Sequence, residues 1–312
     1  MKVLYNKIDK KFIKALQKTK EGKIMYHIIV NPKAGGRKRK CQFKRTLKLF
    51  EEAGAEYIVH ETHYKAHGTE IAAELTKEDG VNLIAVGGDG TVHDVLNGIR
   101  DVQKCNFGII PLGTGNDFAA SAKIPYNVKK AVDIILKGET KPTDYLEVGG
   151  KRCMNVGGVG IDVDVLVRCA KGKRRGRLKY LKSLIVSFFK FNGYELTIEC
   201  GGETIEKKVL MVAACNGGQF GGGIRVCPIA ELDDGKMDVM IVDCFSSKWR
   251  ILKAFIWLVQ GKIMIYPHKR HFHTDSVKIS FKQPCTVQLD GELYDNLEFD
   301  AKICGGLNMF RL

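Results

Sequence analysis

An aspartate set among glycines is the feature of this sequence that most clearly suggests chemistry. Residues 86–91 read Val-Gly-Gly-Asp-Gly-Thr, directly after an apolar run and before a helical pattern. Glycines let the backbone turn sharply, and a helix N-terminus offers free N–H groups to phosphate. Because a carboxylate repels phosphate unless a cation lies between them, Asp89 predicts a metal–nucleotide complex. The alternative interpretation is an ordinary glycine-rich turn.

Two further polar, glycine-rich loops follow predicted strands. Residues 31–36 read Asn-Pro-Lys-Ala-Gly-Gly, and residues 111–119 read Pro-Leu-Gly-Thr-Gly-Asn-Asp-Phe-Ala. Since the carboxyl ends of parallel strands meet at one edge of a sheet, we expect the three loops to form a nucleotide-sized crevice. The chain has no GxxxxGK[ST], HRD or DFG motif and no early GxGxxG, which argues against a P-loop protein, a protein kinase and a dinucleotide fold.

The elements that would position these loops alternate between strand and helix. Apolar strand-like runs are found at residues 25–32, 55–62, 82–88 and 106–113. Helical runs lie between them at residues 40–54, 68–80 and 92–101. This rhythm predicts an α/β domain over residues 25–141, with a parallel, Rossmann-like sheet covered by helices.

The rhythm changes after about residue 142. Short strands separated by Gly, Asp or Pro turns are expected at residues 144–148, 152–158, 194–200, 207–216, 237–245, 276–281 and 285–292. Helices are expected at residues 179–191 and 248–260. The pattern predicts a second, mostly antiparallel β-sandwich domain over residues 142–307.

The first 24 residues form a basic N-terminal extension. Leu4, Ile8, Phe12 and Leu16 recur every four residues with lysines between them, which predicts a basic amphipathic helix able to lie on an anionic membrane. Two alternatives are a solvated helix packed on the body and a leader foreign to the natural protein, whose own start would then be Met25.

Charge and cysteine usage narrow the class of partner. There are 50 Lys and Arg residues against 35 Asp and Glu, a net charge of +15, which attracts polyanions. Basic clusters occur at residues 37–40, 171–179 and 268–273, and they are typical either of solvated surface or of a surface that binds an anionic membrane. The sequence contains no RNA-recognition or helix-turn-helix pattern, so we do not expect nucleic acid as the partner.

The 10 cysteines show no CxxC pair, as expected for reduced thiols in the cytoplasm. Without a secretory signal or spanning segment, we expect peripheral association with the inner face of the membrane.

The three loops together resemble the signature loops of a known family. GGDGTVHDVLNGI, NPKAGG and PLGTGNDFA resemble those of the diacylglycerol kinase catalytic domain family, which includes sphingosine and ceramide kinases and is related in fold to NAD kinases. The resemblance covers nearly everything from residue 25 onward. It implies transfer of the γ-phosphate of Mg²⁺-bound ATP to a lipid hydroxyl, first of all that of diacylglycerol. It also implies that residues 308–312 return to the first domain.

Other outcomes remain open at this point. A sphingoid base, another glycerolipid or NAD are alternative acceptors, and a non-catalytic lipid-binding relative is a further alternative. Asp89, Asp117 and Glu292 are all present, which argues against a silent relative. The sequence leaves a homodimer open.

The resemblance also implies the residues of the nucleotide site. Those expected to line the nucleotide are Asn31, Pro32, Lys33, Ala34, Gly35, Thr62, Gly88, Asp89, Gly90, Thr91, Val92, His93, Asp94, Thr114 and Asn116. Asp89 and Asp117 would organise Mg²⁺, and Asp162 in NVGGVGID would join that network. Family members often have Glu at the position of Asp94, so the shorter acid could change the reach to the nucleotide.

The segment Asp-Gly-Glu at residues 290–292 matches the family's catalytic acid and makes Glu292 the expected general base. A lipid alcohol has a pKa far above neutrality, so removing its proton as it attacks phosphorus helps the reaction. The alternative is a type I′ hairpin turn with a solvated glutamate.

Residues 229–236 resemble a structural Mg²⁺ loop of bacterial family members. Asp234 would supply a carboxylate, while Glu231 and Lys236 would supply backbone carbonyls. Glu231 replaces the Lys common in that subgroup, a change that a backbone ligand would tolerate. A plain Asp-Gly turn is the alternative.

Overall fold

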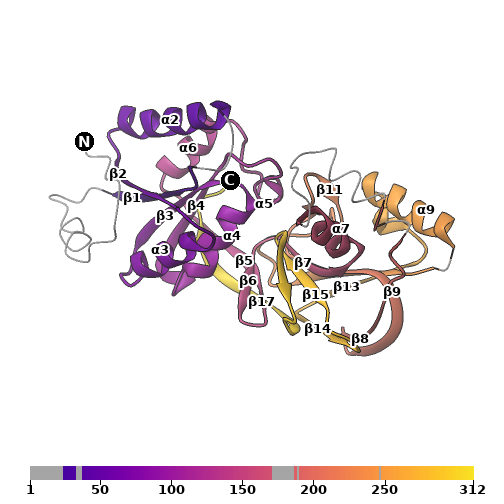
Figure 1. The fold of residues 1–312 in the computed structure, drawn as a ribbon. Coiled ribbons are helices and arrows are strands. Elements are labelled where there is room, and N and C mark those ends of the chain that lie inside the picture. The colour runs from indigo at the N-terminus through magenta and orange to yellow at the C-terminus, as the bar shows by residue number, and fades with distance from the viewer. Residues whose placement is uncertain (1–23, 33–36, 171–185, 188–189, 246) are drawn as a thin grey trace. The chain divides into compact units, whose positions relative to one another are not determined.

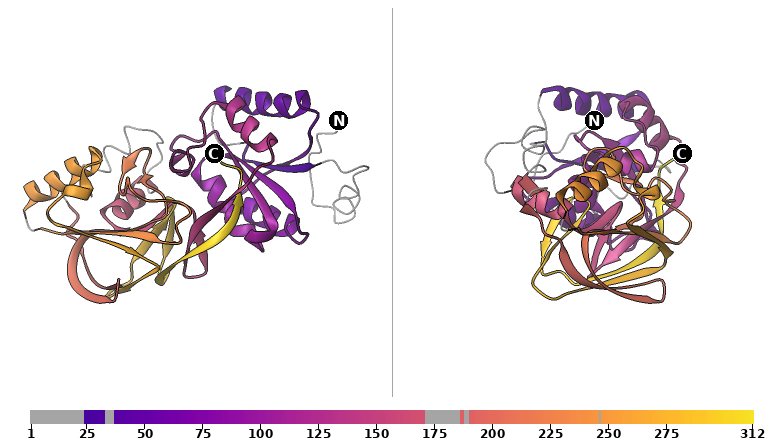
Figure 2. Two further views of the ribbon diagram at one scale, coloured as in Figure 1. Left: turned by 180° about the vertical axis from the view of Figure 1, so that it is seen from behind. Right: turned by 90° about the vertical axis from the view of Figure 1, so that its right-hand side faces the viewer.

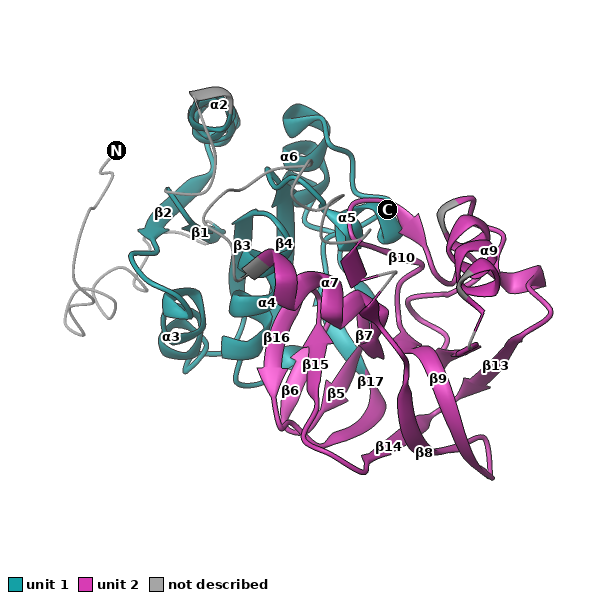
Figure 3. Ribbon diagram, turned by 45° about the vertical axis from the view of Figure 1, so that its right-hand side comes forward, with its two compact units in different colours: residues 1–143, 305–312 teal, residues 144–304 magenta. Residues whose placement is uncertain are grey.

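The structure is a computed structural model that describes residues 24–32, 37–170, 186–187, 190–245 and 247–312 (Figure 1). The predicted N-terminal helix, the basic cluster at 171–179 and most of the predicted helix at 179–191 lie outside these residues. The chain divides into two compact units, residues 1–143 with 305–312 and residues 144–304 (Figure 3). Each unit is described separately below.

The first unit is built on a parallel sheet. Its strands are β1 (Met25–Val30), β2 (Glu56–Glu61), β3 (Val81–Gly87) and β4 (Cys105–Pro111), in the order β4-β3-β1-β2. Every neighbouring pair is parallel, and Met309 near the chain end pairs with Phe107 of β4 in the same sense. The predicted α/β class with parallel strands is therefore confirmed.

Helices cover both faces of this sheet (Figures 1 and 2). On one face lie α2 (Arg37–Glu52) and α6 (Val128–Leu136), and on the other lie α3 (His67–Leu75) and α4 (Asp89–Gly98). Tyr26, Ile28 and Val30 alternate along β1 and pack with Phe50 of α2 and Val132 of α6. Strands buried on both faces read as continuous apolar runs, which is why the sequence indicated them.

The second unit is mostly antiparallel, as predicted. Its strands are β5 (Lys141–Val148), β6 (Lys151–Cys153), β7 (Val156–Gly160), β8 (Tyr194–Cys200), β9 (Glu203–Cys215), β10 (Gln219–Phe220), β11 (Ile224–Arg225), β12 (Met237–Asp243), β13 (Lys269–Thr274), β14 (Ser276–Phe281), β15 (Thr286–Leu289), β16 (Glu292–Asp295) and β17 (Phe299–Met309). The main order is β16-β15-β7-β9-β8-β14-β17, and β12 pairs with β9 and β13. The single strand predicted at 152–158 is wrong, since a turn separates β6 from β7.

Both faces of this second sheet are covered. Along β9, Val212 and Ala214 contribute to one apolar cluster, while Met211 and Ala213 contribute to the other. The helix α9 (Lys248–Val259) packs on the Met211 side, and α7 (Ile161–Ala170) lies against β7, β15 and β16 (Figure 3). None of the helices in the described part of the chain is long and apolar enough to cross a membrane.

Candidate functional site

Two glycine-rich loops of the first unit touch through their backbones. A Cβ atom added to Gly113 would lie 2.3 Å from the Cα atom of Gly88, and one added to Gly88 would lie 2.9 Å from the Cα atom of Gly113. The N–H of Leu112 donates to the carbonyl of Gly87 at 2.8 Å. The loop after β3 and the loop after β4 are thus fixed against each other, and neither glycine position admits a side chain.

Asp89 anchors the second of these loops. Its Oδ2 accepts the N–H of Asn116 at 2.8 Å, and its Oδ1 accepts the N–H of Phe118 at 3.4 Å. Asn116 has a left-handed backbone (φ 53°), and its own Oδ1 accepts the N–H of Gly113 at 2.7 Å. These bonds fix the orientation of a carboxylate at the first position of α4, where the helix N-terminus favours negative charge.

A second carboxylate approaches the first. The helix α5 (Asp117–Ser121) begins at Asp117, whose residue is only 7% exposed. A Cβ atom on Gly115 would lie 2.9 Å from Asp89 Oδ2 and 3.1 Å from Asp117 Oδ2. Two carboxylate oxygens therefore lie against one glycine, and this hard oxygen donor set fits Mg²⁺.

Other predicted nucleotide residues lie in or beside the same loops. Thr62 follows β2, donates its N–H to Val30 at 2.9 Å and is buried. A Cβ atom on Gly68 would meet Asp94 at 3.2 Å and Thr62 at 3.8 Å, which places these two residues near each other. The side chains of Val92 and His93 are buried. A ligand at this loop would meet their backbone rather than their side chains.

Asn31 and Pro32 are partly exposed after β1, whereas Lys33, Ala34 and Gly35 lie outside the described residues. Gly90 and Thr91 are partly exposed in the first turn of α4, and Thr114 is exposed.

Two residues of this region, Arg39 and Tyr126, could not be recognised as site residues from the sequence. Arg39 of α2 donates to Thr114 Oγ1 at 2.5 Å, which brings a guanidinium to the loop after β4. The Tyr126 hydroxyl lies 3.5 Å from the Asn116 carbonyl, and burial together with the charges of Asp117 and Asp89 raises its pKa. The sequence showed Arg39 only as part of a basic cluster, and nothing in it marked Tyr126.

In the second unit, Asp290 and Gly291 form the turn between β15 and β16. Both have positive φ, 54° and 85°, as a type I′ turn requires. The Asp290 carboxylate accepts the N–H groups of Met154 and Asn155, each at 2.8 Å, which also explains the break between β6 and β7. Asp290 therefore holds the turn, and Glu292 begins β16 opposite Leu289 with a partly exposed side chain.

Gln288 belongs to β15 of this hairpin, and Asp162 of α7 lies beside it. Gln288 Oε1 accepts the N–H of Gly291 at 2.9 Å. Burial raises the pKa of Asp162 to about 6, while Gln288 acts in the opposite direction. Among the described residues, the buried Oδ1 atom of Asp162 has no hydrogen-bond partner. Since buried polar atoms are nearly always satisfied, this oxygen can pair with the equally unpaired Nε2 atom of Gln288, or it can serve as a ligand to a bound group.

The predicted structural Mg²⁺ residues share one loop between β11 and β12. Asp234 Oδ1 accepts the N–H of Lys236 at 2.9 Å, and Asp144 Oδ2 accepts the N–H of Gly235 at 2.8 Å. Glu231 lies exposed in the same loop, and the Lys236 ammonium pairs with Asp275. This is an Asp-Gly turn whose carboxylate still has oxygen lone pairs for a cation. The Mg²⁺ site stays a prediction.

Two family models match most of the chain. The diacylglycerol kinase catalytic domain matches residues 25–148. The YegS C-terminal NAD kinase beta sandwich-like domain matches residues 155–307. The first covers the loops around Asp89, and the second covers the hairpin of Glu292.

Individual proteins agree with these matches. The chain is 28% identical over 273 residues to a diacylglycerol kinase of Bacillus subtilis, covering 85% of this chain and 88% of the relative. It is 30% identical over 228 residues to "Probable lipid kinase YegS-like" of Xanthomonas oryzae, covering 69% and 73%. A crystal structure of a diacylglycerol kinase from Bacillus anthracis shares the fold, with a TM-score of 0.70 and 20% identity over 94% of this chain and 98% of that one. The chain therefore belongs to the diacylglycerol kinase catalytic domain family of lipid kinases.

Proposed function

We propose that this protein transfers the γ-phosphate of Mg²⁺-bound ATP to the hydroxyl of diacylglycerol and so produces phosphatidic acid. The observation that carries the proposal is the convergence of Asp89 and Asp117 on Gly115, within two loops that only glycines allow to touch. Such a pair suits a metal ion that bridges to a polyphosphate.

Each group of the first unit has a role in this proposal. Asp89 and Asp117 would hold Mg²⁺, and the metal would neutralise charge on the phosphates. The N-terminus of α4 would face the same phosphates with its positive dipole end. The guanidinium of Arg39, held at Thr114, would add a cation for a phosphate oxygen.

Glu292 would act as the general base. Its place after a two-residue turn fixes its backbone, because the Asp290 carboxylate ties that turn to the two residues just before β7. A positioned base typically contributes about 10²- to 10⁴-fold to a rate. Positioning of the reactants and neutralisation of phosphate charge would supply most of the remainder.

The second unit has features suited to a lipid at a membrane surface. On α9, Trp249 is 77% exposed and Ile256 is 41% exposed, and they lie on one face because they are seven residues apart. Arg250 and Lys253 of the same helix are also exposed. Apolar and cationic side chains on one helix suit the surface of an anionic bilayer.

An apolar cavity lies beneath the same helix. It has a volume of about 20 Å³ and is lined by side chains that include Met211, Ala254 and Leu258. This volume holds about one water molecule. An acyl chain would therefore enter only if α9 moved away from the sheet.

A phosphotransfer assay tests the acceptor. Purified protein, Mg²⁺ and labelled ATP would be offered diacylglycerol, ceramide, sphingosine, other glycerolipids and NAD, with the lipids in anionic mixed micelles. We expect diacylglycerol to be phosphorylated fastest, and Glu292→Gln to lower that rate. Labelling of NAD, or of no lipid at all, would contradict the proposal.

The membrane surface is tested with the same assay on anionic vesicles. Trp249→Glu should lower turnover on vesicles and leave the KM for ATP unchanged. Leu312→Glu, at an exposed residue of the first unit, is the control. Equal activity of the Trp249 variant and the wild type on vesicles would remove α9 from the docking surface.

A further inference from the structure

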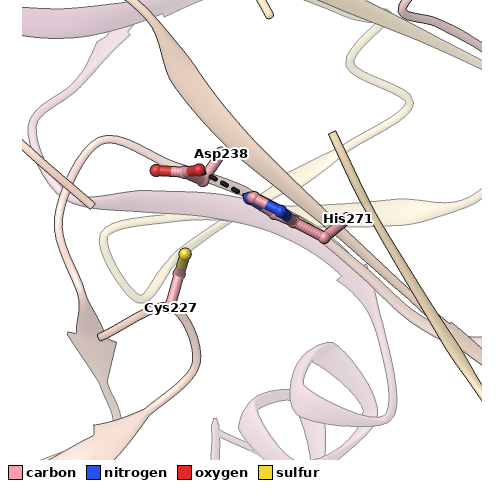
Figure 4. A group of neighbouring side chains, drawn as sticks. All are labelled: Cys227, Asp238 and His271. Carbon is pink, nitrogen blue, oxygen red and sulfur yellow. Dashed lines mark hydrogen bonds and ion pairs between the residues drawn. The ribbon is translucent and has the colours of Figure 1, made fainter. Parts of the chain in front are cut away.

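A second group of chemically capable side chains lies in the second unit. Cys227, Asp238 and His271 place one ligand atom each within 4.8 Å of one another (Figure 4). They come from three segments: the loop between β11 and β12, the strand β12, and the strand β13. We propose that these three side chains bind a zinc ion.

Strand pairing accounts for two of the three ligands. In the antiparallel pair β12–β13, Asp238 lies opposite His273, and His271 is two residues along on the same face. His271 Nε2 lies 2.6 Å from Asp238 Oδ1, which is a hydrogen-bond distance. Two ligands of tetrahedral zinc lie roughly 3.3 Å apart, as metal–ligand distances of about 2.0–2.1 Å require. The His271 side chain is 21% exposed, and zinc binding would require it and Asp238 to separate by this difference.

The third ligand is held by its own backbone. Cys227 is fully buried, donates its N–H to Gly218 at 3.1 Å and accepts the N–H of Ala230 at 3.1 Å. A Cβ atom on Gly218 would lie 2.9 Å from the Cys227 carbonyl oxygen, so only glycine allows this close approach. The sulfur points toward the Asp238–His271 pair (Figure 4). The thiol is therefore placed before any metal arrives.

The donor chemistry selects among metals. A thiolate, an imidazole and a carboxylate form a mixed sulfur, nitrogen and oxygen set, which suits Zn²⁺ and not Mg²⁺. This distinguishes the cluster from the predicted Mg²⁺ site in the same loop, which relies on Asp234 and carbonyl oxygens. Three protein ligands leave a fourth position for water.

The buried carboxylate gives an electrostatic reason for a cation. Asp238 is 3% exposed and lies at hydrogen-bond distance from His271 and His273, and a bound metal would keep this buried charge paired, as such a charge requires. Zn²⁺ would displace the thiol proton of Cys227, so its binding should release a proton and strengthen with pH.

His273 connects the cluster to the Asp234 loop. Its Nδ1 lies 3.3 Å from Asp238 Oδ1, and its Nε2 lies 3.5 Å from Asp234 Oδ2. A ligand carboxylate held by an outer hydrogen-bonding partner is common around zinc. Zinc would thus join the loop between β11 and β12 to the edge of the sheet and stabilise that part of the unit.

The test is metal binding to the whole chain after treatment with a chelator. Titration with Zn²⁺ should show one tight site that excess Mg²⁺ does not displace. Co²⁺ in place of zinc should give a thiolate-to-metal charge-transfer band. Cys227→Ser should abolish that band and weaken Zn²⁺ binding by roughly tenfold or more, with proton release also reduced.

Controls separate this site from adventitious metal. Cys200→Ser replaces a buried cysteine outside the cluster and should leave the band intact. If Cys227→Ser does not fold, His271→Gln at the partly exposed ligand serves instead and should weaken Zn²⁺ binding. Absence of a tight site, or an unchanged band in the Cys227 and His271 variants, overturns the proposal. None of these readouts depends on kinase activity.

Discussion

At the scale of single residues, neighbouring side chains in one motif have separate functions. In Asp-Gly-Glu, Asp290 binds backbone N–H groups, Gly291 supplies a positive φ, and Glu292 is left at the start of a strand. The sequence could indicate the base and the turn as competing interpretations. The structure shows that the turn is present, and a turn does not exclude a base, because the two roles belong to different residues.

Glu292→Gln tests the proposed base. Glutamine keeps the shape of the side chain but cannot accept the alcohol proton, so kcat should fall by roughly 10²- to 10⁴-fold. Affinity for ATP should be unchanged, as measured by equilibrium binding. Asp295→Asn on the same strand, where the carboxylate accepts from Thr286 at 2.6 Å, is the matched control. Wild-type turnover of the Glu292 variant with saturating lipid would exclude it as the base.

Asp89→Asn tests the metal pair. The amide removes a charge next to Asp117 and keeps only one oxygen for the two N–H groups that Asp89 now accepts. We expect a higher Mg²⁺ concentration for half-maximal turnover and a lower kcat. Asp133→Asn, on the exposed side of α6, should behave as the wild type. An unchanged Mg²⁺ dependence would remove Asp89 from the metal network.

At the scale of elements, the site depends on the contact of two loops at the ends of β3 and β4. Their strands were readable because they are buried on both faces and continuously apolar. The contact itself was not, since nothing in the sequence shows that Gly88 and Gly113 meet. The contact of Arg39 could not be predicted for the same reason, because its partner Thr114 is 75 residues away along the chain.

Among the strands of the second unit that the sequence did not predict, β13 and β17 illustrate a different physical reason. The strand β13 reads Lys-Arg-His-Phe-His-Thr and was taken as a basic cluster. It is held by pairing with β12, and its side chains are mostly half-buried, so it lacks an apolar signature. The strand β17 contains Cys-Gly-Gly, which the sequence favours as a turn, yet pairing with β14 keeps its first half extended.

Gly113→Ala tests the contact between the loops. The added methyl group would collide with Gly88, so the loops must separate and the carboxylates must shift. We expect a loss of about 1–3 kcal/mol in the free energy of unfolding and a roughly tenfold or larger loss of kcat/KM for ATP.

The matched control for this variant is Gly138→Ala, at a glycine with φ 76° and open space around it. It should lower stability through backbone strain alone and keep kcat/KM for ATP. A Gly113 variant that loses stability but keeps full kcat/KM would show that the contact does not position the site.

At the scale of the whole molecule, the net charge affects which surfaces attract the protein, and a pair of histidines affects its stability at low pH. The net charge of +15 favours anionic surfaces, which agrees with a lipid acceptor.

In the first unit, His27 of β1 and His60 of β2 stack with ring centroids 5.4 Å apart, and His27 Nδ1 lies 3.1 Å from His60 Nε2. Burial lowers the pKa of His27 to about 4, and burial with repulsion from His27 lowers the pKa of His60 to about 3.

These lowered pKa values predict acid sensitivity. Both histidines bind protons more readily in the unfolded chain, so their contribution is complete above pH 6.5, the ordinary histidine pKa, and is lost as the pH falls toward their folded values. The free energy of unfolding should fall by about 1.4 kcal/mol per pH unit for each histidine. Urea unfolding at several pH values between neutrality and the folded pKa values would measure this slope.

The double variant His27→Gln, His60→Gln should flatten that slope, and His63→Gln at an exposed histidine should not. An equally steep loss of stability in the double variant would assign the acid sensitivity to other groups.

Binding of Mg²⁺-ATP, measured by calorimetry on the purified chain, tests most directly the claim on which the function rests. We predict one site per chain, with heat that requires Mg²⁺ and that Asp89→Asn largely removes. No heat with ATP and Mg²⁺, or equally tight ATP binding with and without the metal, would contradict a site built to hold a magnesium-bridged triphosphate.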